Sequence, residues 1–418
     1  MAAERPSLTR GGLVLAPSVG LTHGLHYAYN VVMAAVLGPA AFGALGALLA
    51  LILLGSVPGI ALQAMAARHT ALLAGGRRDQ RALWASLLRL AAWWGLALAA
   101  VTVAASPALG AWLHLDSPAP VLALALALAP STFSYASQGM LQGREAFVAF
   151  IAVGLVNAVG KLVAGLVLVA AGFGVSGAVA GAAVGTWLGA AAGLLLVRRA
   201  VAAAAPATAR AAPAPTALGR EATVAVTGLL GLFLLTNLDV PLARHFLPAE
   251  ASGHYALGAV VAKIAFWGPQ FVTTLVFARL VTGGDRRRLL AGSAALIVAS
   301  GALLAVGLAA LAALEVALPL LGREYAAIGP ALPLFAALGS SLALVQLLLF
   351  EEIAASARRM GRVLALAAVV QAALIWVAFH DSVGEIVGTA LAVALALVAV
   401  ALAGRRRLPA DLGERPEP

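Results

Sequence analysis

The sequence predicts an all-α integral membrane protein of about 12 transmembrane helices, in two six-helix bundles related by a pseudo-two-fold along the membrane normal. Three observations predict this fold class. First, 62% of the residues are hydrophobic, only 11% are charged and the mean hydropathy is +1.00, whereas soluble domains are about one-quarter charged. Second, arginine clusters separate long apolar runs. Third, the two halves share short motifs at matching places.

The apolar runs are long enough to cross a bilayer, because about 20 residues of helix span the hydrocarbon core. They consist of continuous Leu, Ala and Val stretches, which are typical of helices. The expected spans are residues 11–38, 42–70, 83–105, 119–141, 146–171, 175–197, 221–246, 252–281, 289–313, 327–356, 363–379 and 386–404.

The arginines predict the orientation, because basic loops remain on the cytoplasmic side of a membrane. Alternate loops carry the arginine clusters, and the loops between them carry mostly acidic residues, with Arg323 as the clear exception. We therefore expect both termini in the cytoplasm. The clusters are Arg5 and Arg10; Arg77, Arg78 and Arg81; Arg144; Arg198 and Arg199; Arg210 and Arg220; Arg286 to Arg288; Arg358, Arg359 and Arg362; and Arg405 to Arg407.

The halves resemble each other around the second and eighth spans. Pro39 to Gly43 opens the second span, and Pro248 to Gly253 opens the eighth with one residue inserted. A copied half with an even number of spans keeps its orientation, so the repeats are expected to be parallel. The predicted domains are an N-terminal bundle at 1–199, a cytoplasmic linker at 200–219, a C-terminal bundle at 220–407 and a cytoplasmic tail at 408–418.

Polar residues recur at helical spacing within three of the predicted spans. A spacing near four places side chains on one slowly turning helix face. Isolated Ser and Thr residues commonly join helices by hydrogen bonds, but three such stripes favour a wet cavity. They are Ser18, Thr22, His26 and Asn30; Ser131, Ser134, Gln138 and Gln142; and Tyr255, Lys263, Gln270 and Thr274.

Lysine occurs twice in the chain, as Lys161 and Lys263, and both residues fall near the middle of predicted spans. A charged lysine at the bilayer centre costs about 2.5 to 3.5 kcal/mol, so these positions favour a hydrated cavity over lipid. Lys161 shares its helix face with Asn157. The alternative interpretation is a structural lysine that is paired with another group. An ammonium could hold an anionic headgroup or exchange a proton with a coupling step.

The seventh span contains Asn237 and Asp239 shortly before Pro241, so its helix could be interrupted near the outer end. On an ideal helix these two polar side chains point about 200° apart, and they can line one cavity only if the backbone unwinds. Asp239 is a candidate partner for a coupling cation. His26 is a second candidate for ion coupling, although a packed, hydrogen-bonded histidine is the commoner arrangement.

Several functions are excluded or unsupported by the sequence. No nucleotide-binding loop, dinucleotide fingerprint, zinc-protease motif or hydrolase elbow stands in a suitable context. The chain has no cysteine, which excludes disulfides and thiolate metal sites. The net charge of +10 comes from short clusters between spans and does not predict nucleic-acid binding. We expect a transporter without a cofactor or metal, and not an enzyme.

Four short segments resemble the polysaccharide biosynthesis flippases of the multidrug/oligosaccharidyl-lipid/polysaccharide exporter superfamily. The resemblance covers nearly the whole chain, and only the segments together carry it; Ala40 and Ala41 depart from acidic residues common in the family. The segments are Leu37 to Gly43, Leu141 to Glu145, Gly172 to Gly177, and Asn237 to Asp239 with Glu250 to Tyr255.

The resemblance implies a flippase that moves an undecaprenyl-diphosphate-linked oligosaccharide across the bacterial plasma (inner) membrane by alternating access. Its implied partners are the lipid-linked anionic glycan, membrane lipids, a coupling H⁺ or Na⁺, and a polysaccharide polymerase and glycosyltransferases. The candidate substrate-binding residues are Lys161, Lys263, Asn30, Asn157, Asn237 and Gln270.

Two other functions remain open at this stage. An ion-coupled exporter of small molecules in the same superfamily would bind a drug-like cation, which a lysine-lined cavity disfavours. A membrane glycosyltransferase or polymerase usually needs a large external loop or an acidic metal motif, and the sequence offers neither.

Overall fold

A computed structural model describes residues 8–73, 77–202, 215–268, 286–313, 322–354 and 359–405. These residues are almost entirely helical, and no strand occurs among them. Seven of the described helices are long and apolar enough to cross a membrane by length and composition. The predicted all-α membrane fold is therefore confirmed, and the protein is a multi-pass membrane protein.

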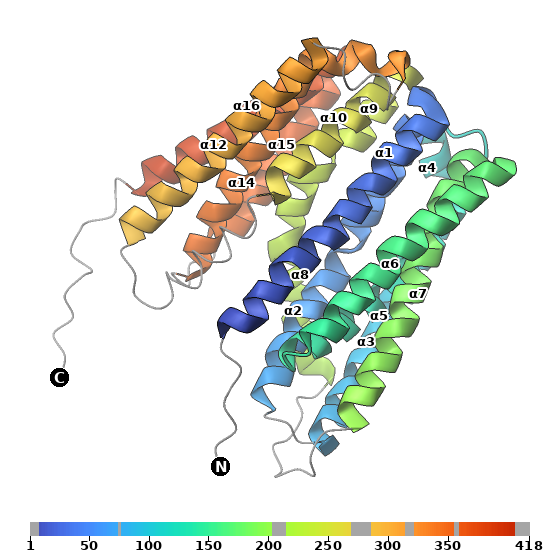
Figure 1. Ribbon diagram of the computed structural model, residues 1–418, viewed down its shortest axis with the longest axis vertical. Helices are drawn as coiled ribbons and strands as arrows, with labels where there is room; N and C mark the ends of the chain where they lie inside the picture. Colours follow the sequence, from blue (N-terminus) through green and yellow to red (C-terminus); the bar gives the residue numbers. More distant parts are fainter. Residues whose placement is uncertain are drawn as a thin grey trace.

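The N-terminal half is built from helices that run back and forth in sequence order (Figure 1). The long α1 reverses direction within itself, as does the segment from α6 to α7. The elements are α1 (Leu8–Gly55), α2 (Val57–Leu72), α3 (Arg77–Ala104), α4 (Ser106–Trp112), α5 (Ala119–Gly143), α6 (Phe147–Leu168), a short π-helix (Val169–Phe173) and α7 (Gly174–Ala202).

Glycines permit the two tight reversals. Gly38 has a φ of 74°, and Gly172 and Gly174 have φ values of 91° and 50°. These left-handed values are strained for a residue with a Cβ atom but cost glycine little. The predicted boundary between the first two spans coincides with the first reversal, at Gly38 and Pro39.

The C-terminal half follows the same alternating course. Its eighth predicted span continues beyond Gly268, outside the described residues. The elements are α8 (Pro215–Asn237), α9 (Asp239–Phe246), α10 (Ala249–Trp267), α12 (Arg286–Ala313), a 3₁₀-helix (Arg323–Ala331), α14 (Leu332–Ala354), α15 (Arg359–Val377) and α16 (Val383–Arg405).

The predicted linker at 200–219 is helical at both edges, because α7 continues to Ala202 and α8 begins at Pro215. Each half packs mainly on itself: α5 packs against α2, α3 and α7, while α14 packs against α10, α12 and α16. The halves meet where α1 packs on α10 and α2 packs on α8. In Figure 1 the blue-to-green helices and the yellow-to-red helices accordingly form two groups.

The two ends of the molecule differ in charge. We call the end where α1 begins the basic end; it includes the starts of α3 and α15 and the end of α7, which carry Arg77, Arg359 and Arg199. We call the opposite end, with Gly38 and α9, the far end. This arrangement places the described arginine clusters on one side, as the sequence predicts.

At the far end, α1 and α10 touch through glycines. A Cβ atom on Gly253 would lie 1.9 Å from the Pro39 carbonyl oxygen, and one on Gly43 would lie 2.2 Å from Ser252 Oγ. The Gly43 Cβ would also lie 2.8 Å from the Gly253 backbone nitrogen. Backbone atoms cannot move away as a flexible side chain can, so Gly253, and to a lesser extent Gly43, leaves no room for a side chain. Small residues thus let the two halves approach closely.

We predict that Gly253→Ala lowers the melting temperature of the purified protein, because the new methyl group overpacks the contact with Pro39 by about 1 to 3 kcal/mol. Gly292→Ala in α12 is the matched control, since a Cβ atom there meets nothing within 4 Å. Helical Gly→Ala replacement otherwise stabilises. Equal melting temperatures for the two variants would contradict the proposed close packing.

Candidate functional site

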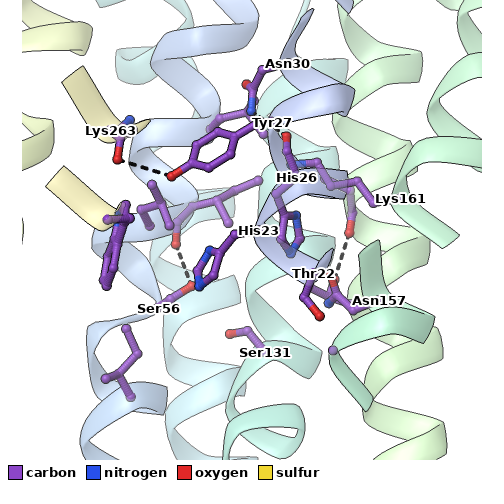
Figure 2. A pocket seen from close by; sticks show the side chains of 18 of the residues that line it. Thr22, His23, His26, Tyr27, Asn30, Ser56, Ser131, Asn157, Lys161 and Lys263 are labelled. Carbon is purple, nitrogen blue, oxygen red and sulfur yellow. Dashed lines mark hydrogen bonds between the residues drawn. The ribbon is translucent and has the colours of Figure 1, made fainter. Parts of the chain in front are cut away.

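A cavity of about 540 Å³ lies between the two halves. Its lining comes from α1, α2, α5, α6 and α7 of the N-terminal half and from α8, α9 and α10 of the C-terminal half. Figure 2 shows polar side chains from several of these helices around the same space. Intramembrane cavities between helices are the usual place for transporter substrates.

The polar stripe of α1 faces this cavity. Thr22, His26 and Asn30 all line it, and Asn30 Nδ2 donates a hydrogen bond to the His26 carbonyl oxygen at 2.8 Å. The side chain of Ser18 lies outside the part of the chain whose side chains are described. The four-residue spacing therefore identified the cavity-facing side of this helix.

The stripe of α5 divides between the cavity and the basic end. Ser131, Ser134 and Gln138 line the cavity. Gln142, one turn further along, instead accepts a hydrogen bond at 3.2 Å from Gln63, a residue of α2 that also lines the cavity. Gln63 thus both borders the cavity and connects α2 to α5.

Lys161 projects from α6 toward the cavity with Asn157, one turn before it (Figure 2). Its Nζ lies 4.1 Å from the centroid of the Tyr29 ring, a cation–π contact. The Tyr29 hydroxyl donates to the Ala178 carbonyl oxygen at 2.7 Å, which fixes the ring. An aromatic face attracts an ammonium group without forming an ion pair with it.

Lys263 reaches the cavity from α10 in the other half. Its carbonyl oxygen accepts a hydrogen bond from the Tyr27 hydroxyl at 3.2 Å, which links α10 to α1. One turn further, Trp267 stacks on His23 with ring centroids 5.8 Å apart. The two lysines of the chain therefore line one cavity from opposite halves, while predicted neighbours Gln270 and Thr274 lie outside the described residues.

Asn237 and Asp239 do not line this cavity; both are buried in the C-terminal half. Helix α8 ends and α9 begins around Leu238, but Leu238 keeps helical φ and ψ of −73° and −24°. The predicted helix break is present without the unwinding that would aim both side chains into one space. This is where the sequence-based expectation of a shared cavity wall departs from the structure.

Asn237 and Asp239 each have one buried oxygen atom without a hydrogen-bond partner among the described residues. Asp239 Oδ2 accepts a hydrogen bond from the Tyr255 hydroxyl at 2.6 Å, and Asn237 Nδ2 donates to the Phe233 carbonyl oxygen at 3.0 Å. The other oxygens, Asn237 Oδ1 and Asp239 Oδ1, are buried and accept no hydrogen bond from the described residues. Such oxygens normally find a partner, so they attract a cation or proton.

Other contacts between the halves were not predicted from the sequence. Arg68 and His69 on α2 each contact Glu221 on α8 at 2.8 Å, so these side chains join the two halves. Arg244 on α9 is buried and bonds to carbonyl oxygens of the N-terminal half. Among the described residues, no group of three or more His, Cys, Asp or Glu residues could hold a metal ion.

The fold is shared with solved membrane transporters, among them one of the multidrug/oligosaccharidyl-lipid/polysaccharide (MOP) superfamily. The family model described as "Polysaccharide biosynthesis protein" matches residues 8–278, and the chain belongs to this family. No curated protein matches the sequence.

Solved structures of transporters share the fold at low sequence identity. A structure titled "Lipid II flippase MurJ, inward closed conformation" has a TM-score of 0.74 and 11% identity, covering 95% of this chain and 88% of that one. An inward-facing multidrug resistance MATE transporter has a TM-score of 0.65 and 12% identity, covering 91% and 93%. The MATE multidrug transporter DinF-BH has a TM-score of 0.63 and 13% identity, covering 97% and 98%.

We predict that Tyr255→Phe lowers the melting temperature more than Tyr325→Phe does. Both phenol rings are buried, but the Tyr255 hydroxyl bonds to the buried carboxyl group of Asp239, whereas the Tyr325 hydroxyl bonds to the Ala34 carbonyl oxygen. A hydrogen bond to a charged group contributes about 1.5 to 3 kcal/mol, against about 0.5 to 1.5 for a neutral one. The reverse order would argue against an ionised Asp239.

Proposed function

We propose that the protein is a flippase that moves an undecaprenyl-diphosphate-linked oligosaccharide across the bacterial plasma membrane for cell-surface polysaccharide biosynthesis. One observation carries the proposal: Lys161 and Lys263 line one cavity from opposite halves. The family supports a role in polysaccharide biosynthesis. The fold is that of transporters, and the cavity supplies positive charge where an anionic headgroup would pass.

The chemistry of the cargo matches the cavity. A diphosphate carries concentrated negative charge, and lysine ammonium groups attract phosphate as point charges. The remaining lining includes amide and hydroxyl groups such as Asn30, Asn157 and Ser131, which can hydrogen-bond to sugar hydroxyls. The prenyl chain can stay among lipid tails while the headgroup crosses through the cavity. In this mechanism the lysines offset the negative charge of the diphosphate, and the cavity keeps the sugar out of the lipid.

Alternating access follows from the placement of the two lysines. Because each half contributes one ammonium, rocking of the halves changes the distance between them and hence the attraction for the headgroup. The arginines of the basic end support a cytoplasmic location for that end and for both termini. During one transport cycle the cavity accordingly opens first to the basic end and then to the far end.

Ion coupling is proposed for Asp239 and His26. Asp239 has one buried oxygen, Oδ1, without a hydrogen-bond donor among the described residues. A proton or Na⁺ bound there would satisfy this oxygen and favour one packing of α9 against its neighbours. His26 lines the cavity, where its charge state would act directly on an anionic cargo.

The alternative function is ion-coupled export of a small organic cation. The fold is shared with multidrug resistance transporters, so the architecture permits it. The sign of the cavity charge separates the two functions. Removing a lysine weakens transport of an anionic cargo but relieves repulsion for a cationic one.

We predict that Lys263→Ala and Lys161→Gln each slow flipping of a diphosphate-linked oligosaccharide at least tenfold in reconstituted vesicles, because each removes one phosphate-attracting charge of the cavity. The matched control is Arg89→Ala in α3, since Arg89 lies outside the cavity lining and bonds within its own helix. The rate is measured by enzymatic accessibility of the glycan on each leaflet.

The control should flip at the wild-type rate with wild-type expression. The same vesicles are loaded with a fluorescent organic cation to test the alternative. Wild-type flipping by both lysine variants, together with faster cation export, would reject the flippase and favour the exporter.

A further inference from the structure

We propose that Arg244 is the positioning residue that holds the far end closed between transport steps, a role that rests on the alternating access proposed above. Arg244 lies in the last turn of α9 and is buried, with 8% of its surface exposed. A buried guanidinium requires many hydrogen-bond partners. The identity of those partners gives the residue its role.

Most of these partners belong to the other half of the molecule. Arg244 Nε donates to the Leu113 carbonyl oxygen at 3.0 Å, and Nη2 donates to the His114 carbonyl oxygen at 3.2 Å. Nη1 donates to the Ala40 carbonyl oxygen at 3.3 Å and to Ser252 Oγ at 3.2 Å. One side chain thus ties two separate N-terminal segments to α9 and α10.

These bonds lie where the backbones of the two halves come closest. Ala40 follows the reversal at Gly38, and Ser252 precedes Gly253, whose Cα admits no side chain against Pro39. The neighbouring His245 extends the contact, because its ring stacks on Trp112 with centroids 5.5 Å apart. Closure of the far end therefore brings the carbonyl oxygens into the one arrangement that satisfies the guanidinium.

Neutral partners make this closure reversible. The hydrogen bonds recorded for Arg244 go to carbonyl and hydroxyl oxygens. The Asp116 carboxylate acts on its charge from further away, but no carboxylate among the described residues forms an ion pair with it within 4.0 Å. Opening the far end exposes the guanidinium to water, which replaces these bonds at modest cost. A buried carboxylate partner would make separation far more expensive.

Different contacts join the halves at the basic end, so substitutions at the two ends can be compared. There Glu221 of α8 pairs with Arg68 and His69 of α2. Loss of the Glu221 charge should loosen the basic end, whereas loss of Arg244 should loosen the far end. The two ends can therefore be opened separately by single substitutions.

The experiment uses the absence of cysteine in the chain. Ala259→Cys places one thiol on the cavity wall contributed by α10, and a membrane-impermeant thiol reagent is applied to sealed vesicles from the far-end side. Vesicle orientation is identified separately with Asp381→Cys, because the Asp381 side chain is 84% exposed between α15 and α16. The readout is the labelling rate, which requires no knowledge of the cargo.

In the Ala259→Cys background we expect Arg244→Gln to raise the labelling rate from the far-end side about tenfold, because three bonds between the halves are lost. Arg244→Lys keeps the charge but not the forked geometry, and should give an intermediate rate. Glu221→Gln should leave this rate unchanged or lower it. Arg323→Gln, an exposed arginine of the 3₁₀-helix, should have no effect.

An unchanged labelling rate in both Arg244 variants overturns the proposal, including the case in which their melting temperatures fall, since that result assigns Arg244 a structural role alone. Equal acceleration by Glu221→Gln also overturns it, because the effect is then not specific to one end. Faster labelling in the Arg244 variants, together with no glycan flipping by the unmodified protein, would support the closure and count against the proposed cargo.

Discussion

The structure depends on keeping two ammonium groups inside a membrane-spanning fold. Each costs about 2.5 to 3.5 kcal/mol at the bilayer centre if it faces lipid. Lys161 and Lys263 avoid this cost by facing a cavity between the halves, where the Tyr29 ring lies against Lys161. Among the described residues that line the cavity there is no carboxylate, and the nearby Asp239 interacts electrostatically with Lys263 alone of the two lysines. The same requirement keeps the halves from packing into a dry interface.

Much of this arrangement follows from local sequence patterns. Apolar run length located the helices, and a spacing of four located the face of α1 that carries His26 and Asn30. The depth of each lysine within its span was enough to predict a shared hydrated space. Contacts between distant segments carry no such signal: Arg244 bonds to Leu113 across 131 residues, and Arg68 bonds to Glu221 across 153. Asn237 lies outside the cavity lining because Leu238 keeps helical torsion angles.

The halves are joined by different kinds of contact at the two ends of the molecule. At the far end the halves meet through glycines and through hydrogen bonds from Arg244 to carbonyl oxygens, whereas at the basic end Arg68 forms an ion pair with Glu221. Between them lies the cavity, and beside it the free oxygens of Asn237 and Asp239. Attraction of the headgroup, closure of the far end and ion coupling are thus proposed for different residues. A substitution that changes one of these functions can leave the other two intact.

The most direct test of the central claim is the equilibrium binding of two ligands to the purified protein, measured by displacement of a fluorescent analogue. The ligands carry the same oligosaccharide on undecaprenyl diphosphate and on an uncharged prenyl lipid. The account predicts that the diphosphate ligand binds at least tenfold more tightly, and that this preference disappears in the Lys161→Gln/Lys263→Gln double variant. Equal affinities for the two ligands in the wild-type protein would contradict the account.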